Sequence, residues 1–552
     1  MHRPPAFHYT RPTDLDLAAP RRVPLVIVGA GLVGLTLALD LAQRGVASIV
    51  LEARDATGEG SRAIVFAQRS IEILARLGLR EPLLSKGVDW RTGRVFYQGR
   101  EAYSFDFRTE DGYSCPPFVN IQQSYIEAWL TERCLASGLV EIRSQNAVTA
   151  VAHTEHGAQL ALRCPDGDYT LNTHWLVACD GARSFVRSAL ELPFVGRMFH
   201  DRFLIVDVEM DPGFSAERRF WFDPPFHPDK SVLLHKQPDS LWRVDFQLGP
   251  DADLAQEREP ERVAQRLRQM LGPDIAFRID WISIYSFRCR RLARFVHQRV
   301  IFAGDSAHEV SPFGGRGGNG GIQDADNLGW KLAAVLRYGA DPALLQSYDE
   351  ERVYAADENI LNSTRSACFI TPESPAVKVL REAVLLLAGQ TALGRSLVNS
   401  GRLSRPANLH ATSQFRAQHG SITPGTPAPD APVLNHGQPD WLINHIGRTG
   451  FSVLGYELTG AQWASVRRDS AWPLDLISVG TSSGLHSDVT HLVDVENKVA
   501  ARYQLQPGHV VLLRPDQHVL ATLSVLDVPT LNRLINRAMQ LYTETQPLEA
   551  TS

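Results

Sequence analysis

The chain has 552 residues, of which 44% are hydrophobic and 21% are charged. This composition is typical of a folded globular protein and excludes collagen-like, disordered and repeat-dominated chains. At roughly 150 residues per domain, the length predicts two to four domains. The formal net charge of −5 gives no reason to expect nucleic acid or an anionic membrane as a partner.

The six cysteines are scattered along the chain and form no CxxC pair. This spacing predicts no zinc module or other metal site and no disulfide framework, and it favours a reducing, cytoplasmic location. An apolar run over 23–39 follows two arginines, as in a secretory signal, but glycines interrupt it. No stretch reaches the length of a membrane span, so we expect no membrane association.

The first twenty residues are rich in Pro, Arg and Asp, lack a helical or strand period, and are expected to form a flexible arm (1–20). Residues 25–28 then form an apolar run typical of a buried parallel strand. Residues 32–44 have the spacing of an amphipathic helix, and residues 48–51 repeat the strand pattern. Together they predict a compact β-α-β unit of the length used for dinucleotide binding.

A glycine motif lies in the turn between the first strand and the helix. Gly29, Gly31 and Gly34 have the GxGxxG spacing, which permits a tight turn and a close approach of backbone amides to a pyrophosphate. Glu52 follows the second strand, where a carboxylate accepts hydrogen bonds from ribose hydroxyls and repels a 2′-phosphate. These features favour the adenosine half of FAD or NAD over that of NADP.

The sequence pattern changes in two later segments. Over 91–107 and 203–248 the side chains alternate and many are aromatic, which predicts an antiparallel sheet in a second domain. Residues 175–179 and 299–303 return to short buried strands, followed by Asp180-Gly181 and by Gly304-Asp305. The nucleotide-binding domain is therefore expected to be discontinuous.

A glycine-rich stretch follows the second of these strands, with six glycines within residues 314–321. Such a stretch is costly in a packed element because each glycine loses more backbone entropy than alanine, by about 0.5–1 kcal/mol. We expect a loop with a ligand pressed against its backbone, and a following helix whose positive end is aimed at that ligand.

The motifs, in this order and at these spacings, resemble the class A flavoprotein monooxygenases, the single-component aromatic hydroxylases of the p-hydroxybenzoate hydroxylase type. In that family the GxGxxG loop holds the FAD diphosphate and the acid after the second strand holds the adenosine ribose. The DG motif serves FAD and reduced nicotinamide, and the Asp of the GD motif holds the ribityl chain. Arg62 resembles an arginine after the ribose acid, and Gln123 a glutamine that opens an FAD-contacting helix. The resemblance implies these cofactor-binding residues: Gly29, Gly31, Leu32, Val33, Gly34, Glu52, Ala53, Arg62, Gln123, Asp180, Gly181, Gly304, Asp305, Pro312, Gly315, Gly317, Gly318 and Asn319.

The C-terminal part resembles one branch of this family. Residues 412–432 are a Pro/Gly-rich connector, and strand and helix patterns follow it. Residues 510–519 are similar to the VRPDxxV stretch in the C-terminal thioredoxin-like domain of the 3-(3-hydroxyphenyl)propionate, phenol and polyketide hydroxylase branch. Residues 234–245 look most like the 3-(3-hydroxyphenyl)propionate hydroxylase group. No cysteine follows Cys368, so this domain is expected to lack a CxxC and its dithiol chemistry.

The expected fold class combines α/β and α+β architecture. A discontinuous Rossmann-like FAD-binding domain spans 21–90, 112–195 and 290–400, and an antiparallel-sheet substrate domain spans 91–111 and 196–289. A linker at 401–432 leads to a thioredoxin-like domain at 433–552. Ser306, where the family more commonly has alanine, is a departure from its pattern.

The resemblance implies an FAD-dependent monooxygenase that consumes NADPH or NADH and O2 and hydroxylates a phenolic aromatic substrate through a flavin C4a-hydroperoxide. We expect the amides of Gly317, Gly318 and Asn319 to stabilise the negative charge that a reduced flavin gains. A phenol with a pKa near 10 costs roughly 4 kcal/mol to ionise at pH 7, so a group in the pocket should assist. The candidates are His308, Tyr285, His235, Asp245 and the carbonyl of Pro312, and for each side chain a packing role stays open. Arg288, Arg290 and Arg291 are candidates for pairing with a substrate carboxylate, for a solvated face or for contacts between domains.

Other functions stay open at this stage. The same scaffold serves polyketide hydroxylases and Baeyer-Villiger-type monooxygenases, and a non-catalytic flavin-binding protein is a further alternative. A flavin halogenase is disfavoured because the sequence has no Trp-x-Trp motif. The family resemblance implies a homodimer, and the choice between NADH and NADPH is open.

Overall fold

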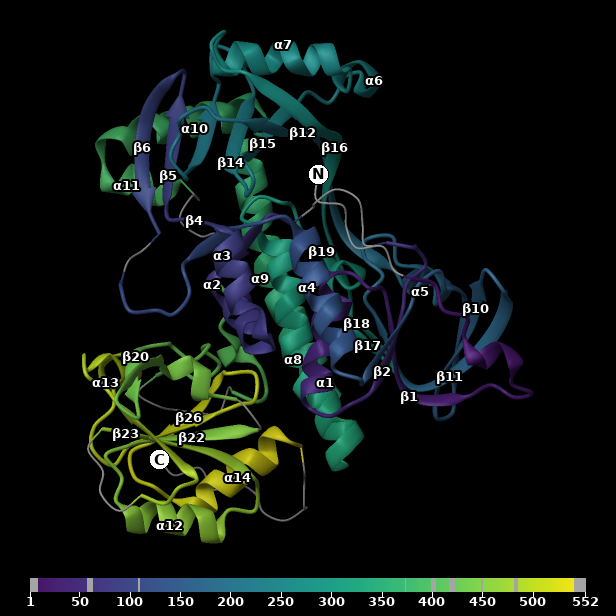
Figure 1. Cartoon of the computed structure of the whole chain (residues 1–552). Helices are drawn as coiled ribbons and strands as arrows, with labels where there is room; N and C mark the ends of the chain where they lie inside the picture. The colour runs from purple at the N-terminus through teal and green to yellow at the C-terminus, as the bar shows by residue number, and fades with distance from the viewer. Residues whose placement is uncertain are drawn as a thin grey trace.

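The computed structural model describes residues 8–56, 63–107, 110–372, 374–398, 404–415, 422–447, 450–480 and 485–540. Three large sheets organise this part of the chain, with a three-stranded sheet between two of them. Figure 1 shows the antiparallel sheet at the top, a parallel sheet on the right and the C-terminal sheet at the lower left. None of the helices in the described residues is both long enough and apolar enough to cross a bilayer.

The parallel sheet contains the predicted β-α-β unit. Its strand order is β17 (Val296–His297), β18 (Val300–Phe302), β11 (Gly167–Ala178), β1 (Arg22–Val28), β2 (Ser48–Leu51) and β8 (Val140–Arg143). β1 pairs in parallel with both β2 and β11, and β11 pairs in parallel with β18. Strands far apart in sequence thus form one sheet, which confirms the prediction of a discontinuous, Rossmann-like unit.

Helices pack against this sheet and against one another. α1 (Leu32–Gln43) contacts α4 (Gln123–Ala136) and α8 (Arg316–Tyr338), and α8 contacts α9 (Leu344–Ile370). Figure 1 shows these helices running side by side through the centre of the molecule. A short helix, α5 (Phe185–Ala189), follows β11, and the hairpin of β9 (Ala147–Thr154) and β10 (Gly157–Cys164) extends β11.

The structure corrects the expectation of a flexible arm for residues 8–20. A 3-10 turn, η1 (Thr13–Asp16), lies against β11, and the buried carboxylate of Asp14 accepts a hydrogen bond of 2.7 Å from Arg143. Tyr9 donates a hydrogen bond of 2.8 Å to Asp166. These partners lie more than 125 residues away in sequence, so no local pattern indicates them.

The antiparallel sheet has the order β19 (His308–Glu309), β16 (Phe277–Leu292), β12 (Phe194–Met210), β15 (Leu241–Leu248), β14 (Ser231–Lys236), β13 (Arg218–Phe222), β5 (Thr92–Tyr97) and β6 (Arg100–Asp106). Its outer face packs on α7 (Pro260–Leu271), which follows the short α6 (Leu254–Glu257). Its inner face packs on the end of α9 and on α10 (Pro375–Gln390), which leads to α11 (Ala392–Leu397). The antiparallel sheet predicted from the alternating segments is therefore confirmed. α10 packs against it, although residues 290–400 were assigned to the FAD-binding domain by sequence.

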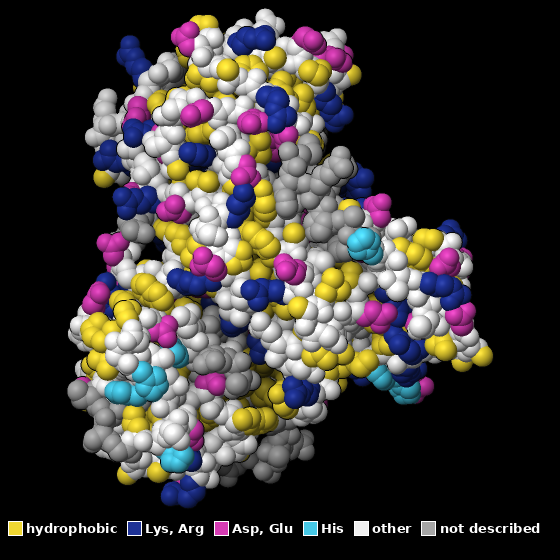
Figure 2. Space-filling view, in the orientation of Figure 1, with side chains coloured by type: hydrophobic (Ala, Val, Ile, Leu, Met, Phe, Trp, Pro, Cys, Tyr) yellow, Lys and Arg dark blue, Asp and Glu magenta, His cyan; other side chains and the backbone are white. Residues whose placement is uncertain are grey.

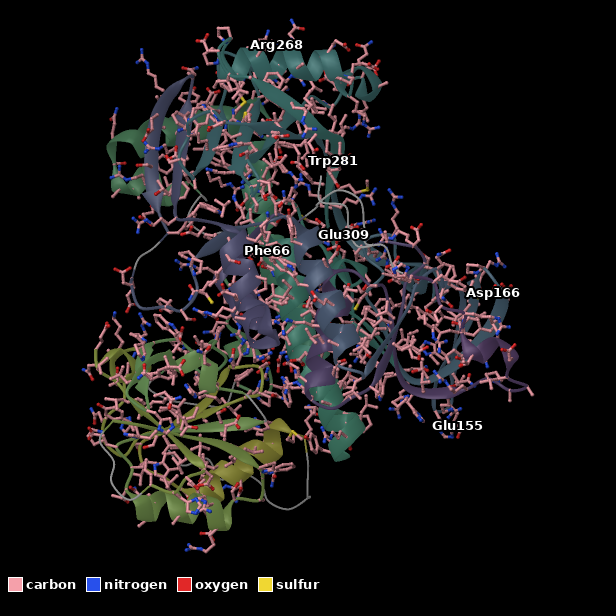
Figure 3. All side chains as sticks on the ribbon, in the orientation of Figure 1. Phe66, Glu155, Asp166, Arg268, Trp281 and Glu309 are labelled. Atoms are coloured by element: carbon pink, nitrogen blue, oxygen red, sulfur yellow. The ribbon has the colours of Figure 1, made fainter. Side chains whose placement is uncertain are left out.

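A small sheet joins the two larger ones. β3 (Val65–Ala67) and β4 (Val88–Trp90) flank β7 (Phe118–Asn120), and the helical segment α2 (Gln68–Leu74), η2 (Ala75–Leu79) and α3 (Arg80–Lys86) lies beside them. The side-chain amide of Asn120 donates 2.8 Å to the carbonyl of Lys236 in the antiparallel sheet. Figure 3 labels Phe66 of β3 at this junction.

The C-terminal unit has a seven-stranded sheet with the order β21 (Gln438–Trp441), β20 (Pro432–Asn435), β24 (Val489–Val493), β23 (Leu474–Val479), β22 (Phe451–Tyr456), β25 (Val510–Leu513) and β26 (Val519–Leu523). The helical elements η4 (Leu409–Ala411), η5 (Leu442–His445), α12 (Gly460–Asp469), α13 (Lys498–Tyr503) and α14 (Val528–Ala538) accompany it. Side chains of the Pro/Gly-rich connector, among them Ile422, Ala428 and Ala431, are buried in its core. The thioredoxin-like character of this unit and the exact domain boundaries stay predictions.

Buried ionic groups join the C-terminal unit to α8 and α9. Arg514 donates to both carboxylate oxygens of Glu351 at 2.7 and 2.9 Å, and Lys331 donates to the same carboxylate at 3.1 Å. The carboxylate of Asp516 accepts from Asn327 at 3.1 Å. Because these five side chains are buried and bonded to one another, they fix the C-terminal unit against the helices behind the glycine-rich stretch.

Candidate functional site

The glycine motif after β1 is packed too closely for any other residue at two positions. Gly29 has a φ of +107°, and a Cβ on it would lie 2.5 Å from the carbonyl oxygen of Cys179. A Cβ on Gly34 would lie 2.1 Å from the carbonyl oxygen of Gly29. α1 begins at Leu32 after Gly31, which provides no side-chain cap. The first amides of α1, including those of Val33 and Gly34, are thus presented at a helix start, as pyrophosphate binding requires.

Glu52 lies at the end of β2 with only 5% of its surface exposed. Its carboxylate accepts hydrogen bonds from the amide of Ala30 at 3.0 Å and from the amide and Nε of Arg54 at 3.1 and 2.9 Å. These donors hold the carboxylate beside the glycine turn, where a ribose would lie. Ala53 follows it on the surface. Arg62 lies outside the described residues.

Gln123 opens α4 and reaches the same turn. Its side-chain oxygen accepts from the amide of Ala63 at 3.2 Å, and its nitrogen donates to Glu127 at 2.7 Å. Glu127 in turn accepts from the amide of Leu32 at 3.0 Å, and burial raises the pKa of this carboxyl to about 7. Glu127 was not singled out from the sequence, since a carboxylate inside an amphipathic helix carries no signal of its own.

The two later motifs meet the first at the ends of neighbouring strands. Asp180 accepts from the amide of Val186 at 3.1 Å, and burial raises the pKa of its carboxyl. Gly181 has a φ of +76°. The turn η3 (Gly304–Ser306) follows β18, and a Cβ on Gly304 would lie 2.8 Å from Val33. The DG and GD motifs therefore both lie close to the start of α1.

The glycine-rich stretch differs from the expected loop. Gly314 and Gly315 form a left-handed turn with φ of +97° and +61°, but α8 begins at Arg316, so the remaining four glycines are helical. A Cβ on Gly321 would lie 2.5 Å from Val33, and one on Gly318 would lie 2.9 Å from Ala63. These two glycines are therefore required for close packing of α8, rather than as a flexible ligand loop.

Despite this packing, no side chain of the N-cap residue caps the first amides of α8. Gly315 provides no side-chain cap, and Gly317 lies in the first turn. A Cβ on Gly317 would lie 4.0 Å from the carboxylate oxygen of Asp305. The side chain of Asn319 bonds the β3 backbone, accepting from Ala67 at 2.9 Å and donating to Val65 at 2.9 Å. The amides at this helix start and the Asp305 carboxylate thus face the same space.

His308 and Ser306 are held beneath the glycine-rich stretch. Nε2 of His308 lies 2.7 Å from the buried carboxylate of Asp324, which also accepts from Arg352 at 2.6 Å. The hydroxyl of Ser306 lies within hydrogen-bonding distance of the carbonyl oxygens of Ala178, at 2.6 Å, and Ala303, at 2.8 Å. This explains the serine at a position where the family commonly has alanine, and His308 is held in an internal hydrogen bond with Asp324.

The inner face of the antiparallel sheet meets the glycine-rich stretch through aromatic side chains. Phe313 packs edge-on against Phe203 and Phe287, each with its ring centre at 5.1 Å. Tyr285 pairs with Phe203 across β12 and β16, so both point to this face. The neighbouring Pro312 is exposed, and its carbonyl accepts from the amide of Gly315 at 3.0 Å. Figure 3 labels Trp281 in this sheet and Glu309 on β19 below it.

His235 and Asp245 lie on the same inner face. Nε2 of His235 is 3.8 Å from the carboxylate of Asp245. Burial raises the pKa of Asp245 to about 6, although the positive charges of Arg243 and Arg218 oppose this rise. Burial and the same two arginines hold the pKa of His235 well below its usual value. A neutral imidazole and a carboxylate that titrates near neutral pH are therefore adjacent.

Two of the three arginines proposed for a substrate carboxylate are engaged elsewhere. Arg290 donates to Glu309 at 2.6 and 2.8 Å, and Arg291 donates to Asp357 at 2.6 and 2.8 Å. The side chain of Arg288 forms no hydrogen bond or ion pair among the described residues.

A cavity of about 430 Å³ lies on the other side of β3, toward the C-terminal unit. Its walls come from 67–69, Phe107, 110–113, Cys115, 117–118 and 404–406. None of the site residues predicted from the sequence lines this cavity.

A family model described as "FAD binding domain" matches residues 22–363, which is more than half of the chain. The chain belongs to this FAD-binding domain family. The geometry fits the cofactor, because two open helix starts, a buried ribose-side carboxylate and the Asp305 carboxylate converge on one region. The residues present thus fit FAD as the cofactor of this protein.

Curated relatives of this FAD-binding protein cover nearly its whole length. It is 27% identical over 556 residues to a 3-(3-hydroxy-phenyl)propionate/3-hydroxycinnamic acid hydroxylase of Shigella sonnei (strain Ss046), with 97% of each chain covered. The same identity and coverage hold for the enzyme of that name from Escherichia coli (strain K12 / DH10B).

Solved structures of flavin enzymes share the fold. The flavin-dependent monooxygenase PieE, in complex with FAD and substrate, superposes with a TM-score of 0.79 at 22% identity over 95% of this chain and all of that one. Aklavinone-11 hydroxylase, in complex with FAD and aklavinone, gives a TM-score of 0.74 at 22% identity with the same coverage. The p-nitrophenol 4-monooxygenase PnpA from Pseudomonas putida DLL-E4 is 27% identical, with a TM-score of 0.61 over 70% of this chain and all of that one.

Proposed function

We propose that this flavoprotein hydroxylates a phenolic aromatic substrate, consuming O2 and NADPH or NADH. The observation that carries the proposal is the inner face of the antiparallel sheet. Its aromatic side chains, Phe203 and Phe287, contact Phe313 beside the glycine-rich stretch. Its polar side chains, His235 and Asp245, lie on β14 and β15 of the same face. An aromatic ring stacked on this face would lie between the flavin region and groups able to accept a phenolic proton.

The residues of the chain have separate tasks in this proposal. Bound FAD supplies the oxygen-transfer chemistry, with electrons from the nicotinamide. The amides at the start of α8, at Gly317 and Gly318, stabilise negative charge beside them. Asp245 is assigned as the acceptor of the phenolic proton, because its pKa of about 6 leaves it ionised at pH 7. The buried hydrogen bond between His308 and Asp324 favours a supporting role for His308 beneath the glycine-rich stretch.

The proposed FAD contacts are those implied by the sequence motifs, from the GxGxxG turn through Glu52, Gln123, Asp180 and Asp305 to Asn319. We further propose a homodimer and a cytoplasmic location. A polyketide ring system, or insertion of oxygen beside a ketone, is the second candidate, supported by the fold shared with aklavinone-11 hydroxylase.

A steady-state screen tests the proposal. Phenols with different side chains are added to the FAD-loaded protein, and NADPH or NADH consumption, peroxide release and product mass are measured together. The proposal predicts faster nicotinamide oxidation and a ring product heavier by one oxygen atom. A lactone product would support the second candidate, and peroxide alone with every phenol would contradict the proposal.

A further inference from the structure

A row of polar side chains crosses the inner face of the antiparallel sheet. Arg219 of β13 pairs with Leu234 of β14, and the same register continued by one residue places Arg218 opposite His235. His235 pairs with Arg243 of β15, and Arg243 pairs with Asp207 of β12. Because directly opposite residues in an antiparallel sheet point to the same side, all four side chains share one face. Gln237 follows two residues after His235, just beyond the end of β14.

The two arginines in this row have different surroundings. The guanidinium of Arg243 donates to both carboxylate oxygens of Asp207, each at 2.7 Å. Arg218 is equally buried, with 7% exposure, but its Nε has no hydrogen-bond partner among the described residues. Burial lowers the pKa of Arg218 only to about 10, so the group is charged at neutral pH. The charge of the Asp245 carboxylate opposes this fall in pKa, but the two groups form no ion pair among the described residues. A buried guanidinium whose Nε lacks a hydrogen bond is costly, which makes it unusual as a purely structural feature.

Two further buried side chains of this part of the sheet have polar atoms that lack partners. Nδ1 of His235 and both side-chain atoms of Gln237 are without hydrogen-bond partners within the described part of the chain. His235 is 3% exposed and Gln237 is 1% exposed. The imidazole is neutral because burial and the two arginines hold its pKa well below the usual value. Buried polar groups in proteins are nearly always hydrogen-bonded, so three such side chains together indicate a bound molecule.

The polar row lies away from Phe203, the side chain of this face that contacts Phe313 beside the glycine-rich stretch. Phe203, which contacts Phe313 beside Pro312, lies four residues before Asp207 on β12. At about 3.3 Å per residue, Asp207, the β12 member of the row, is roughly 13 Å from Phe203 along the strand. Arg218 lies three strands further across the sheet, on β13. A substrate with its ring near the flavin therefore reaches the row only with its hydroxyl or with a side chain.

We infer that Arg218, together with His235 and Gln237, forms a subsite that binds an oxyanion of the substrate and so determines which aromatic compounds the enzyme accepts. The inference rests on the proposed function. A guanidinium is the group best suited to carboxylate, and an amide and a neutral imidazole supply further donors. The oxyanion has two chemical sources, a carboxylate on a ring side chain or the ionised phenol itself.

Three probe ligands separate these sources: 3-(3-hydroxyphenyl)propionate, 3-ethylphenol, which lacks its carboxylate, and 3-phenylpropionate, which lacks its hydroxyl. Dissociation constants are measured without turnover, from the change in flavin absorbance of the oxidised, FAD-loaded protein. The variants are Arg218→Met, Arg218→Lys and the control Arg219→Met. Arg219 lies on the same strand but on the opposite face, where it pairs with Glu217 at 2.8 Å.

A carboxylate subsite predicts that Arg218→Met weakens binding of the two propionates at least tenfold and leaves 3-ethylphenol within twofold. A phenolate subsite predicts that the two phenols weaken at least tenfold and 3-phenylpropionate does not, with loss of the phenolate band in the difference spectrum. In either case Arg218→Lys should recover part of the affinity, since it keeps the charge, and Arg219→Met should match the unmodified protein.

Unchanged affinities of Arg218→Met for all three probes would overturn the inference. An equal loss of affinity for all three probes, with unchanged flavin retention, would also overturn the inference. Such a loss would indicate a general packing defect and not a subsite for one oxyanion. The proposed function fails separately: if no phenol is hydroxylated although Arg218 discriminates among the probes, the subsite stands and the assigned reaction falls.

Discussion

At the scale of single residues, Glu52 combines two tasks. Its carboxylate fixes the glycine turn through the amide of Ala30, and it lies where the adenosine ribose would bind. A hydrogen bond to a charged group contributes about 1.5–3 kcal/mol, so removal of the carboxylate should weaken FAD binding by roughly tenfold to a hundredfold. We predict this loss for Glu52→Ala and a smaller one for Glu52→Gln, measured by quenching of flavin fluorescence. Unchanged FAD retention in Glu52→Ala would remove the assignment.

Asp245 allows a pH test at the same scale. Burial raises the pKa of this carboxyl to about 6, and only its ionised form accepts a phenolic proton. We therefore predict that kcat/KM falls as the pH drops through about 6, and that Asp245→Asn loses this acid limb together with most of the rate. The matched control is Asp251→Asn at an exposed position, which should keep the profile. The same acid limb in Asp245→Asn would assign the titration to another group.

The sequence indicates some site residues and not others, and the difference has one physical reason. Gly29, Gly34 and Glu52 are indicated by the sequence because their roles follow from local spacing. Arg218 and Gln237 gain their meaning from strands that pair only in the folded sheet, so their local sequence resembles that of any half-buried strand. Sequence reasoning did single out His235 and Asp245, but it gave no reason to join them to Arg218.

At the scale of elements, α8 shows why glycines are ambiguous in a sequence. Because each glycine loses much backbone entropy in a packed element, the six glycines predicted a loop. In the structure α8 begins at Arg316, and four of the six glycines are helical. Their missing side chains allow α8 to approach Val33 and Ala63, a tertiary contact that no local period reveals. The parallel and antiparallel strands were predictable, because their hydrophobic patterns are continuous or alternating.

Two glycines of α8 provide a matched pair of variants. A Cβ on Gly321 would lie 2.5 Å from Val33, so Gly321→Ala should lower the free energy of unfolding by about 1–3 kcal/mol through overpacking. The nearest atom to a Cβ on Gly317 is 3.7 Å away, so Gly317→Ala should leave stability unchanged or raise it by about 0.5–1 kcal/mol. Urea unfolding measures both. Equal stability of the two variants would contradict the packing role.

At the scale of the whole molecule, buried polar contacts join the three units. The outer surface of the molecule carries charges of both signs. Figure 2 shows acidic and basic side chains interspersed over the visible face, in keeping with the net charge of −5. Division into units was predictable from composition shifts, whereas the way the C-terminal unit is attached was not. Arg514 belongs to the stretch 510–519 that resembles the family, but its partner Glu351 lies 163 residues away in sequence, so the ion pair has no local signal.

The attachment of the C-terminal unit to α9 can be tested by removing the charge of Arg514. Arg514 and Glu351 are both fully buried, and removal of one partner leaves an uncompensated charge, which costs about 3–5 kcal/mol. We predict this loss in the free energy of unfolding for Arg514→Met, and a smaller loss for the double variant Arg514→Met/Glu351→Gln. Denaturant unfolding followed by circular dichroism measures it. A change below about 1 kcal/mol in the single variant would contradict the proposed attachment.

The central claim is that this molecule uses FAD to place one atom of O2 on a phenolic ring. The most direct measurement is a turnover of the FAD-loaded protein with NADPH, 3-(3-hydroxyphenyl)propionate and ¹⁸O2, followed by mass spectrometry of the product. The account predicts a dihydroxylated ring that carries one ¹⁸O atom, with the second ¹⁸O atom in water. A protein that binds no flavin, or a product with no ¹⁸O, would contradict it.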